Sequence, residues 1–209
     1  MTPAKDENAR SRRTRLPPAE RRAQLLRCAL SVFAERGLAR AVHADVATAA
    51  DVAVSTVFLY FPTREKLVDA VLTEVERFYI ELAEQVHAID APAIEVIREH
   101  ARRFRASIES HPDHALIWMN WAARPRSPDW GRYLELTERL VAIHRRTIQR
   151  GLDDGTVPPH VEPDAAARIL IGYAQFTAQL KLSAFDDART SALGTTLVMA
   201  VLGAGAEAA

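Results

Sequence analysis

The stretch that decides the fold runs from Ala44 to Phe61 and has the sequence ADVATAADVAVSTVFLYF. It contains two runs of about two helical turns each, 44–50 and 54–61, separated only by residues 51–53. Two short helices joined this closely are typical of a helix-turn-helix, whose second helix enters the major groove of DNA. The stretch therefore predicts a DNA-binding head.

The two runs divide into an inward and an outward face. The residues expected to lock the helices together are apolar: Ala47, Val52, Val57 and Phe61. The side chains left to face base edges are then Val54, Ser55, Thr56 and Leu59. Contacts to the phosphate backbone are expected from flanking positions at helix starts and ends, namely His43, Ala44, Tyr60 and Lys66.

The charge distribution supports a nucleic-acid partner even though the net charge is zero. Between residues 10 and 27 there are seven arginines and one acid, Glu20. Such local asymmetry is typical of a phosphate-binding end on an otherwise neutral chain. We expect residues 1–15 to be a flexible basic arm whose Arg12, Arg13 and Arg15 reach the minor groove, although a merely solvated tail is the alternative.

Outside the motif the sequence again predicts helices and no convincing strand. One helix precedes it, from near Leu16 to Gly37, and a long one follows Thr63, a plausible N-cap, over 64–87. Further helices are expected over 92–110, 113–123, 130–151, 163–183 and 187–202, with breaks at prolines and glycines. The prediction is an all-α fold of about nine helices.

Composition excludes several classes of protein. No stretch approaches the ~20 apolar residues of a membrane-spanning helix, and we expect no secretory signal, because the first residues carry charges but no apolar run. A single cysteine, Cys28, permits no internal disulfide, so a cytoplasmic protein is expected. We expect no enzyme, cofactor or metal site, because neither the His111 and His114 pair nor Asp153 and Asp154 has partners at characteristic spacing.

The pattern from Val46 to Leu67, V-A-x-x-A-x-V-x-V-S-T-V-F-x-Y-F-x-x-R-E-x-L, resembles the helix-turn-helix of the TetR family. Residues 22–37 resemble that family's first helix. Arg13 to Leu16, Tyr60 to Glu65 and Trp118 to Ala123 further resemble the quorum-sensing master regulators of the LuxR/HapR type. The resemblance is dense from Arg13 to Leu72 and thin beyond.

The resemblance implies a sequence-specific transcriptional regulator in three parts: the arm (1–15), the DNA-binding domain (16–64) and a ligand-binding and dimerisation domain (65–209). It implies a homodimer formed through the last two long helices on a pseudo-palindromic site in double-stranded DNA. It also implies an apolar pocket for a small ligand, for which the sequence offers Tyr79, Leu82, Ala83, Trp118, Trp121, Tyr133, Thr137, Ala174 and Phe176. Packed core is the alternative for these residues.

Three residues depart from the family's usual pattern. Asp51 and Ala53 stand where glycine and serine are usual, and Leu59 replaces a polar residue of the reading helix. Aspartate tolerates left-handed backbone, so the turn can form. The chain should therefore bind DNA, but the operator of its relatives does not carry over. A quorum-sensing-type global regulator and a ligand-released local repressor of a transporter or catabolic operon both remain open, as do activation and repression.

Overall fold

The computed structural model describes residues 16–183 and 185–203; the basic arm with Arg12, Arg13 and Arg15 lies outside these residues. The described part contains helices and no strand, which confirms the predicted all-α fold. The helices are α1 (Pro18–Arg36), α2 (His43–Ala50), α3 (Val54–Tyr60), α4 (Arg64–His87), α5 (Ala93–Ser110), α6 (Pro112–Ala122), α7 (Trp130–Asp153), α8 (Pro163–Leu182) and α9 (Asp187–Leu202).

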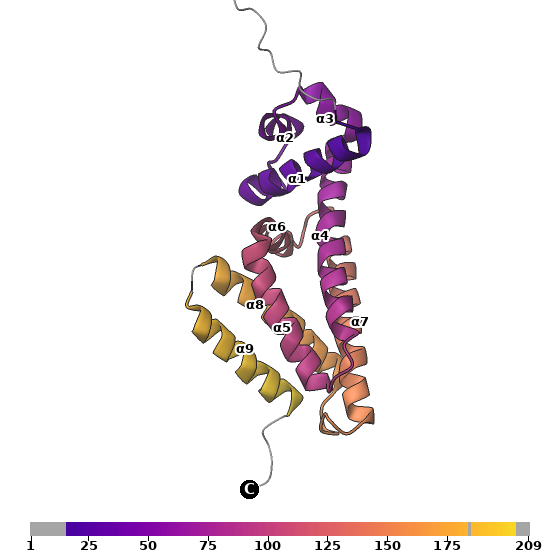
Figure 1. Cartoon of the computed structure of the whole chain (residues 1–209), viewed down its shortest axis with the longest axis vertical. Helices are drawn as coiled ribbons and strands as arrows, with labels where there is room; N and C mark the ends of the chain where they lie inside the picture. Colours follow the sequence, from indigo (N-terminus) through magenta and orange to yellow (C-terminus); the bar gives the residue numbers. More distant parts are fainter. Residues whose placement is uncertain (1–15, 184, 204–209) are drawn as a thin grey trace, which may run out of the picture.

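The first three helices form a small head at one end of an elongated molecule (Figure 1). Proline occupies the first position of α1, where its missing N–H costs no hydrogen bond, and Gly37 ends the helix with a φ of 81°. The head closes around fully buried apolar side chains, among them Phe33, Val57 and Phe61. Burial of Val57 and Phe61 confirms the inward face predicted for the motif.

The turn between α2 and α3 depends on Asp51. This residue adopts the left-handed conformation, with φ 51° and ψ 53°, and its backbone N–H bonds back to the carbonyls of Ala47 and Thr48. The position thus has the backbone geometry that glycine serves best, and aspartate is among the few other residues that reach it at low cost. The prediction that the turn survives the departure from glycine is confirmed.

The long helix α4 leaves the head and runs the length of the bundle (Figure 1). The hydroxyl of Thr63 accepts a hydrogen bond from the backbone N–H of Lys66, so the predicted N-cap is present. Arg132 of α7 binds the upper half of α4 through Asp69 and Glu76, at 2.7 and 2.6 Å. These contacts hold α4 and α7 side by side below the head.

A second connection between head and bundle passes through α6. Ser31 of α1 donates a hydrogen bond to Asp113, and the backbone N–H of Leu38 donates one to the side chain of Asn120. Figure 1 places α6 directly beneath α1. The head is therefore attached to the bundle at two points, α4 and α6.

The helix α9 lies at one edge of the bundle, and α8 passes behind α5, between α9 and α7 (Figure 1). Glu162 caps α8 by accepting from the backbone N–H groups of Asp164 and Ala165, and Asp186 caps α9 by accepting from that of Arg189. Within the described residues, no helix is both long and apolar enough to cross a membrane.

Candidate DNA-binding head and ligand cavity

The reading helix α3 turns a mixed face outward. Leu59 is 76% exposed, Val54 and Ser55 are also exposed, and Thr56 is half-buried. All four side chains predicted to face base edges therefore lie on or near the surface. A surface of two aliphatic and two hydroxyl side chains can contact thymine methyl groups and hydrogen-bond to base edges or phosphates.

The predicted phosphate contacts fall around the same face. Ala44 and Lys66 are exposed in the first turns of α2 and α4, and Tyr60 is half-buried at the end of α3. Helix N-termini present free backbone N–H groups and a partial positive charge, which favour phosphate. The N-termini of α2 and α4 therefore both offer such groups in the head.

The side chain of His43 takes a structural role instead of the predicted phosphate contact. It is buried, and its Nε2 lies 2.7 Å from the carbonyl oxygen of Phe61, to which it donates. Its ring also stacks on Phe58, with centroids 4.1 Å apart. Only the backbone N–H of His43 is left for a phosphate, because the imidazole already joins α2 to the end of α3.

Phe58 is a surface residue that the sequence analysis did not single out. Its side chain is 46% exposed and lies beside the reading face, packed on His43. A hydrophobic residue in an apolar run is normally assigned to the core, so no local signal marked it. The ring adds apolar area next to Leu59.

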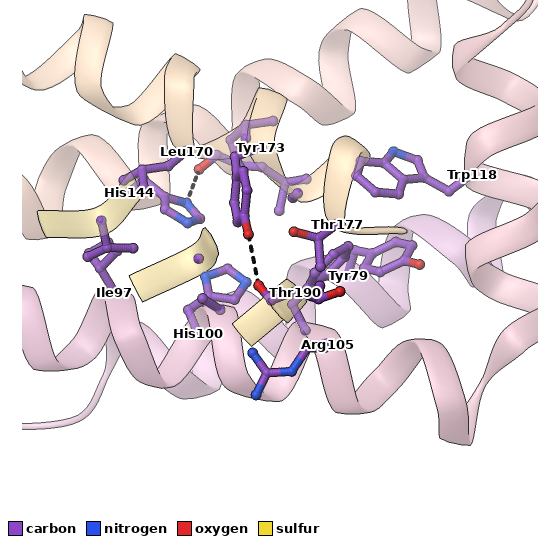
Figure 2. Close-up of a pocket in the computed structure, with 17 residues that line it drawn as sticks. Tyr79, Ile97, His100, Arg105, Trp118, His144, Leu170, Tyr173, Thr177 and Thr190 are labelled. Atoms are coloured by element: carbon purple, nitrogen blue, oxygen red, sulfur yellow. Dashed lines mark hydrogen bonds between the residues drawn. The ribbon is translucent and has the colours of Figure 1, made fainter. Parts of the chain in front are cut away.

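The bundle contains an apolar cavity bounded by α4, α5, α6, α7, α8 and α9. It is narrow, with a total volume of about 730 Å³ when space open to solvent is counted. Aliphatic and aromatic side chains form most of its walls, with Trp118 and Tyr79 at one end and His100 and His144 at the other (Figure 2). A concave, mostly apolar space with few polar groups is typical of small-molecule sites.

Seven polar side chains are among the lining residues: Tyr79, His100, Arg105, His144, Tyr173, Thr177 and Thr190. The hydroxyl of Tyr173 donates to the carbonyl of Thr190 at 3.2 Å (Figure 2), and Arg105 brings a guanidinium to the rim. The buried hydroxyl of Thr177 has no hydrogen-bond partner. Burial raises the pKa of the Tyr79 phenol, which therefore stays neutral as a donor. An occupant with one polar end would satisfy Thr177.

The structure places three of the nine predicted pocket residues on the cavity wall: Tyr79, Trp118 and Ala174. The others lie elsewhere in the bundle: Leu82, Ala83, Trp121, Tyr133, Thr137 and Phe176. Trp121 is core, with its indole N–H bound to the carbonyl of Asp129, and Tyr133 bonds to Gln175. Phe176 is 46% exposed on the outer face of α8. The helical spacing correctly predicted that most of these nine residues are buried, but it did not predict which of them face the cavity.

The sequence analysis missed the walls contributed by α5, α7 and α9. Their residues include Ile97, His100, Phe104, Leu140, His144 and Val198. Each sits on an amphipathic helix whose apolar stripe also forms ordinary core, so the sequence pattern does not distinguish wall from core.

Comparison with known proteins agrees with this architecture. A family model for bacterial regulatory proteins of the tetR family matches residues 25–71. The HTH-type transcriptional regulator LuxR of Vibrio harveyi is 34% identical over 167 residues, which are 80% of this chain and 82% of that protein. The HTH-type transcriptional repressor KstR2 of Mycobacterium tuberculosis is 23% identical over 151 residues, 72% of this chain and 76% of that protein.

Solved structures share the fold at lower identity. A TetR-like regulator from Rhodococcus superimposes with a TM-score of 0.75 at 17% identity, covering 92% of this chain and all of its own. FadR from Bacillus subtilis, solved in complex with stearoyl-CoA, gives 0.72 at 18% identity, covering 86% of this chain and 97% of its own. Both neighbours are described as transcriptional regulators. With its helix-turn-helix head and its similarity to LuxR, the chain belongs to the TetR family and is a DNA-binding transcriptional regulator.

Proposed function

We propose that the chain is a dimeric, LuxR-type global regulator that binds a pseudo-palindromic operator and whose DNA affinity is set by a small apolar ligand in the bundle. The observation that carries this proposal is that α6 contacts both the cavity and the DNA-binding head. Trp118 of α6 lines the cavity, and Asn120, two residues later, holds the head through Leu38. A ligand that moves α6 therefore acts on the head directly.

The narrowness of the cavity supports a mechanical response. An occupant of drug-like size would have to displace the surrounding side chains, because little of the volume is free for it. Such a ligand binds two arrangements of the bundle with different affinity, and that difference is what shifts the head. FadR's complex with stearoyl-CoA supports an apolar chain as the type of occupant.

The surface of α8 supports a dimer. Ile169 and Phe176 are 49% and 46% exposed, and Gly172 lies between them on the same face with open space where a Cβ would be. Leu193 of α9 is exposed as well. Large apolar side chains around a glycine suit close packing against the same helix of a second copy, and two heads then match the two halves of an operator.

The dimer is tested by sedimentation and by operator titration. The wild type should sediment as a dimer at micromolar concentration, and Phe176→Glu should yield folded monomers with greatly weakened operator binding. Leu116→Glu changes an exposed apolar residue of another helix, α6, and is the matched control. A Phe176→Glu protein that stays dimeric would remove this face from the interface.

Whether the protein regulates many genes or a single operon is tested separately. Similarity to LuxR, at 34% identity, supports a global regulator of the quorum-sensing type, and many scattered sites are expected in genome-wide binding maps. The similarity to KstR2 repressors favours the second candidate, a ligand-released repressor of a neighbouring transporter or catabolic operon. A single site beside one operon would select that candidate.

A further inference from the structure

Three histidines from three different helices meet at one end of the cavity. His87 ends α4, His100 lies on α5 and His144 on α7, and one ring nitrogen of each lies within 4.8 Å of the others. The ring centroids are 4.5 to 5.0 Å apart. Figure 2 shows the rings of His100 and His144 next to each other on the cavity wall. The DNA-binding function described above makes no use of them.

Hydrogen bonds to the outer nitrogens orient these rings. Nδ1 of His144 lies 2.9 Å from the carbonyl oxygen of Leu140, which can only accept, so this nitrogen carries the proton. Nε2 of His144 therefore presents a lone pair toward the cluster. Nδ1 of His87 lies 2.7 Å from the hydroxyl of Thr147, while its Nε2 points to Nδ1 of His100 at 2.9 Å.

This arrangement matches what a metal ion requires of histidine ligands. In metal sites the ligating ring usually donates its other N–H to a carbonyl or hydroxyl, which fixes the tautomer. Leu140 and Thr147 occupy these outer positions for His144 and His87. A metal ligand must offer an unprotonated ring nitrogen, and Nε2 of His144 is unprotonated because Nδ1 donates to the carbonyl of Leu140.

The size of the cluster also fits. Two nitrogens that bind one zinc ion at ~2.0–2.1 Å lie about 3.4 Å apart in a tetrahedral site. The facing nitrogens of His87 and His100 are closer than this, at 2.9 Å, and the widest of the three nitrogen pairs is farther apart, within 4.8 Å. Small rotations of the rings would therefore bring all three nitrogens to the spacing that a zinc ion requires. The ion would replace the hydrogen bond between Nε2 of His87 and Nδ1 of His100, and the proton of that bond would move to another ring nitrogen or be released to solvent.

The histidine cluster is bordered by the cavity on one side and by a surface depression on the other. His100 and His144 line the cavity, and His87 lines a surface depression together with Glu84, Arg146 and Arg150. The two guanidiniums cannot ligate a cation, but they favour an anion that accompanies it. A metal held by three protein ligands keeps its fourth position open, and two of the three ligands here line the cavity.

We propose that His87, His100 and His144 form a site for a divalent transition-metal ion such as Zn²⁺, with its open coordination position directed into the cavity. Three imidazoles and no thiolate suit zinc, cobalt, nickel or copper rather than calcium or magnesium. An ion there gives the apolar cavity one point of positive charge, which selects occupants with an anionic oxygen. The proposed metal site does not depend on whether the protein regulates many genes or a single operon.

The test measures metal bound to the whole chain after stripping with a chelator. Equilibrium dialysis against Zn²⁺ alone should give one ion per chain, and Co²⁺ should give the intense visible absorption of a four-coordinate site. His87→Gln, at the half-buried position, and His100→Gln should each lower the affinity at least tenfold. Thr147→Val, which keeps all three ligands, should lower it about 10–100-fold.

Matched controls use the histidines outside the cluster. His111 and His114 also lie close together, with ring centroids 5.6 Å apart, so the double variant His111→Gln/His114→Gln removes the other nearby pair. It should bind Zn²⁺ as the wild type does. Circular dichroism and operator binding verify that each variant is folded. If the His111→Gln/His114→Gln variant lost Zn²⁺ binding, or if the wild type bound no ion at micromolar Zn²⁺, the cluster would be only a hydrogen-bonded part of the core.

Discussion

The side-chain oxygen of Asn120 accepts a hydrogen bond from the backbone N–H of Leu38 at 3.0 Å. The carbonyl of Leu38 in turn accepts from the guanidinium of Arg64 at 2.5 Å, at the start of α4. One buried residue of the head is thus bound by both helices that enter the bundle. Gly37 beside it leaves room for this contact, because a Cβ there would lie 3.2 Å from the Asn120 amide nitrogen.

Asn120→Ala should weaken communication between cavity and head. Loss of one hydrogen bond at a half-buried site is expected to lower the free energy of unfolding by about 0.5–1.5 kcal/mol. The larger effect should be on coupling, so that a ligand changes operator affinity less in the variant than in the wild type. Titration of a fluorescent operator with and without ligand measures this. Leu116→Ala, on the exposed side of the same helix, is the control, and an equal ligand response in Asn120→Ala would contradict the route through α6.

Much of the fold follows from local signals in the sequence. Thr63 and Gly37 set helix ends as predicted, and α4 has the bounds 64–87 that the apolar spacing indicated. α7 runs to Asp153, two residues past the predicted end at Gly151, because a glycine inside a helix lowers its stability without ending it. Local chemistry therefore accounts for the elements and most of their limits.

The sites depend on how helices pack, and their residues were predicted less well. His87, His100 and His144 are separated by 13 and 44 positions and share no spacing motif; only the rotation of three helices brings them together. Trp121 and Trp118 lie one helical turn apart, yet one is core and the other faces the cavity. Sequence periodicity predicts that a face is buried, but not what it meets there.

Leu59→Ala should change which DNA sequence is preferred while leaving the fold intact. The side chain is 76% exposed, so its removal costs little stability, whereas a missing interaction with a thymine methyl group relaxes selectivity at that base pair. Selection of binding sites from a random pool, followed by thermal unfolding, tests both points. Val57→Ala is the contrasting variant: it is fully buried, and it should unfold more easily by about 0.5–1.5 kcal/mol or more. Unchanged site preference in Leu59→Ala would place this residue outside the interface.

Lys66→Ala and deletion of residues 1–15 should each reduce the salt dependence of operator binding. Removing one cation that neutralises a phosphate lowers the slope of log affinity against log salt by about 0.9. Lys66 is exposed in the first turn of α4, so one such interaction is expected from it and several from the arginines of the arm. Affinities measured at a series of salt concentrations give the slopes. Arg139→Ala, an exposed charge on α7, should leave the slope unaltered, and an unaltered slope in the deletion variant would exclude the arm from the complex.

Asp51→Val should destabilise the head, since a β-branched residue is strained at a φ of 51°. The expected loss is about 1–2 kcal/mol in the free energy of unfolding, together with weaker operator binding. Asp51→Gly introduces the residue that accepts this conformation freely and should be more stable than the valine variant. Urea unfolding monitored by circular dichroism compares both variants with the wild type. Equal stability of the valine and glycine variants would mean that the turn changes its conformation in solution.

His114→Gln should reduce the loss of stability in acid. The His114 ring is buried against Phe78, with centroids 4.6 Å apart, and its Nε2 has no hydrogen-bond partner. Burial, and then the charge of His111 and of Arg77, lowers its pKa, although Glu74 and Asp113 oppose this. Because the folded pKa lies below the unfolded value of about 6.5, the neutral ring contributes its full stability above that pH, and protonation removes it as the pH falls toward the folded pKa. Below pH 6.5 the slope of unfolding free energy against pH should be smaller in His114→Gln than in the wild type, by the equivalent of at most about one bound proton. Parallel slopes in the wild type and in His114→Gln would mean that His114 is protonated in the folded chain as readily as in the unfolded one.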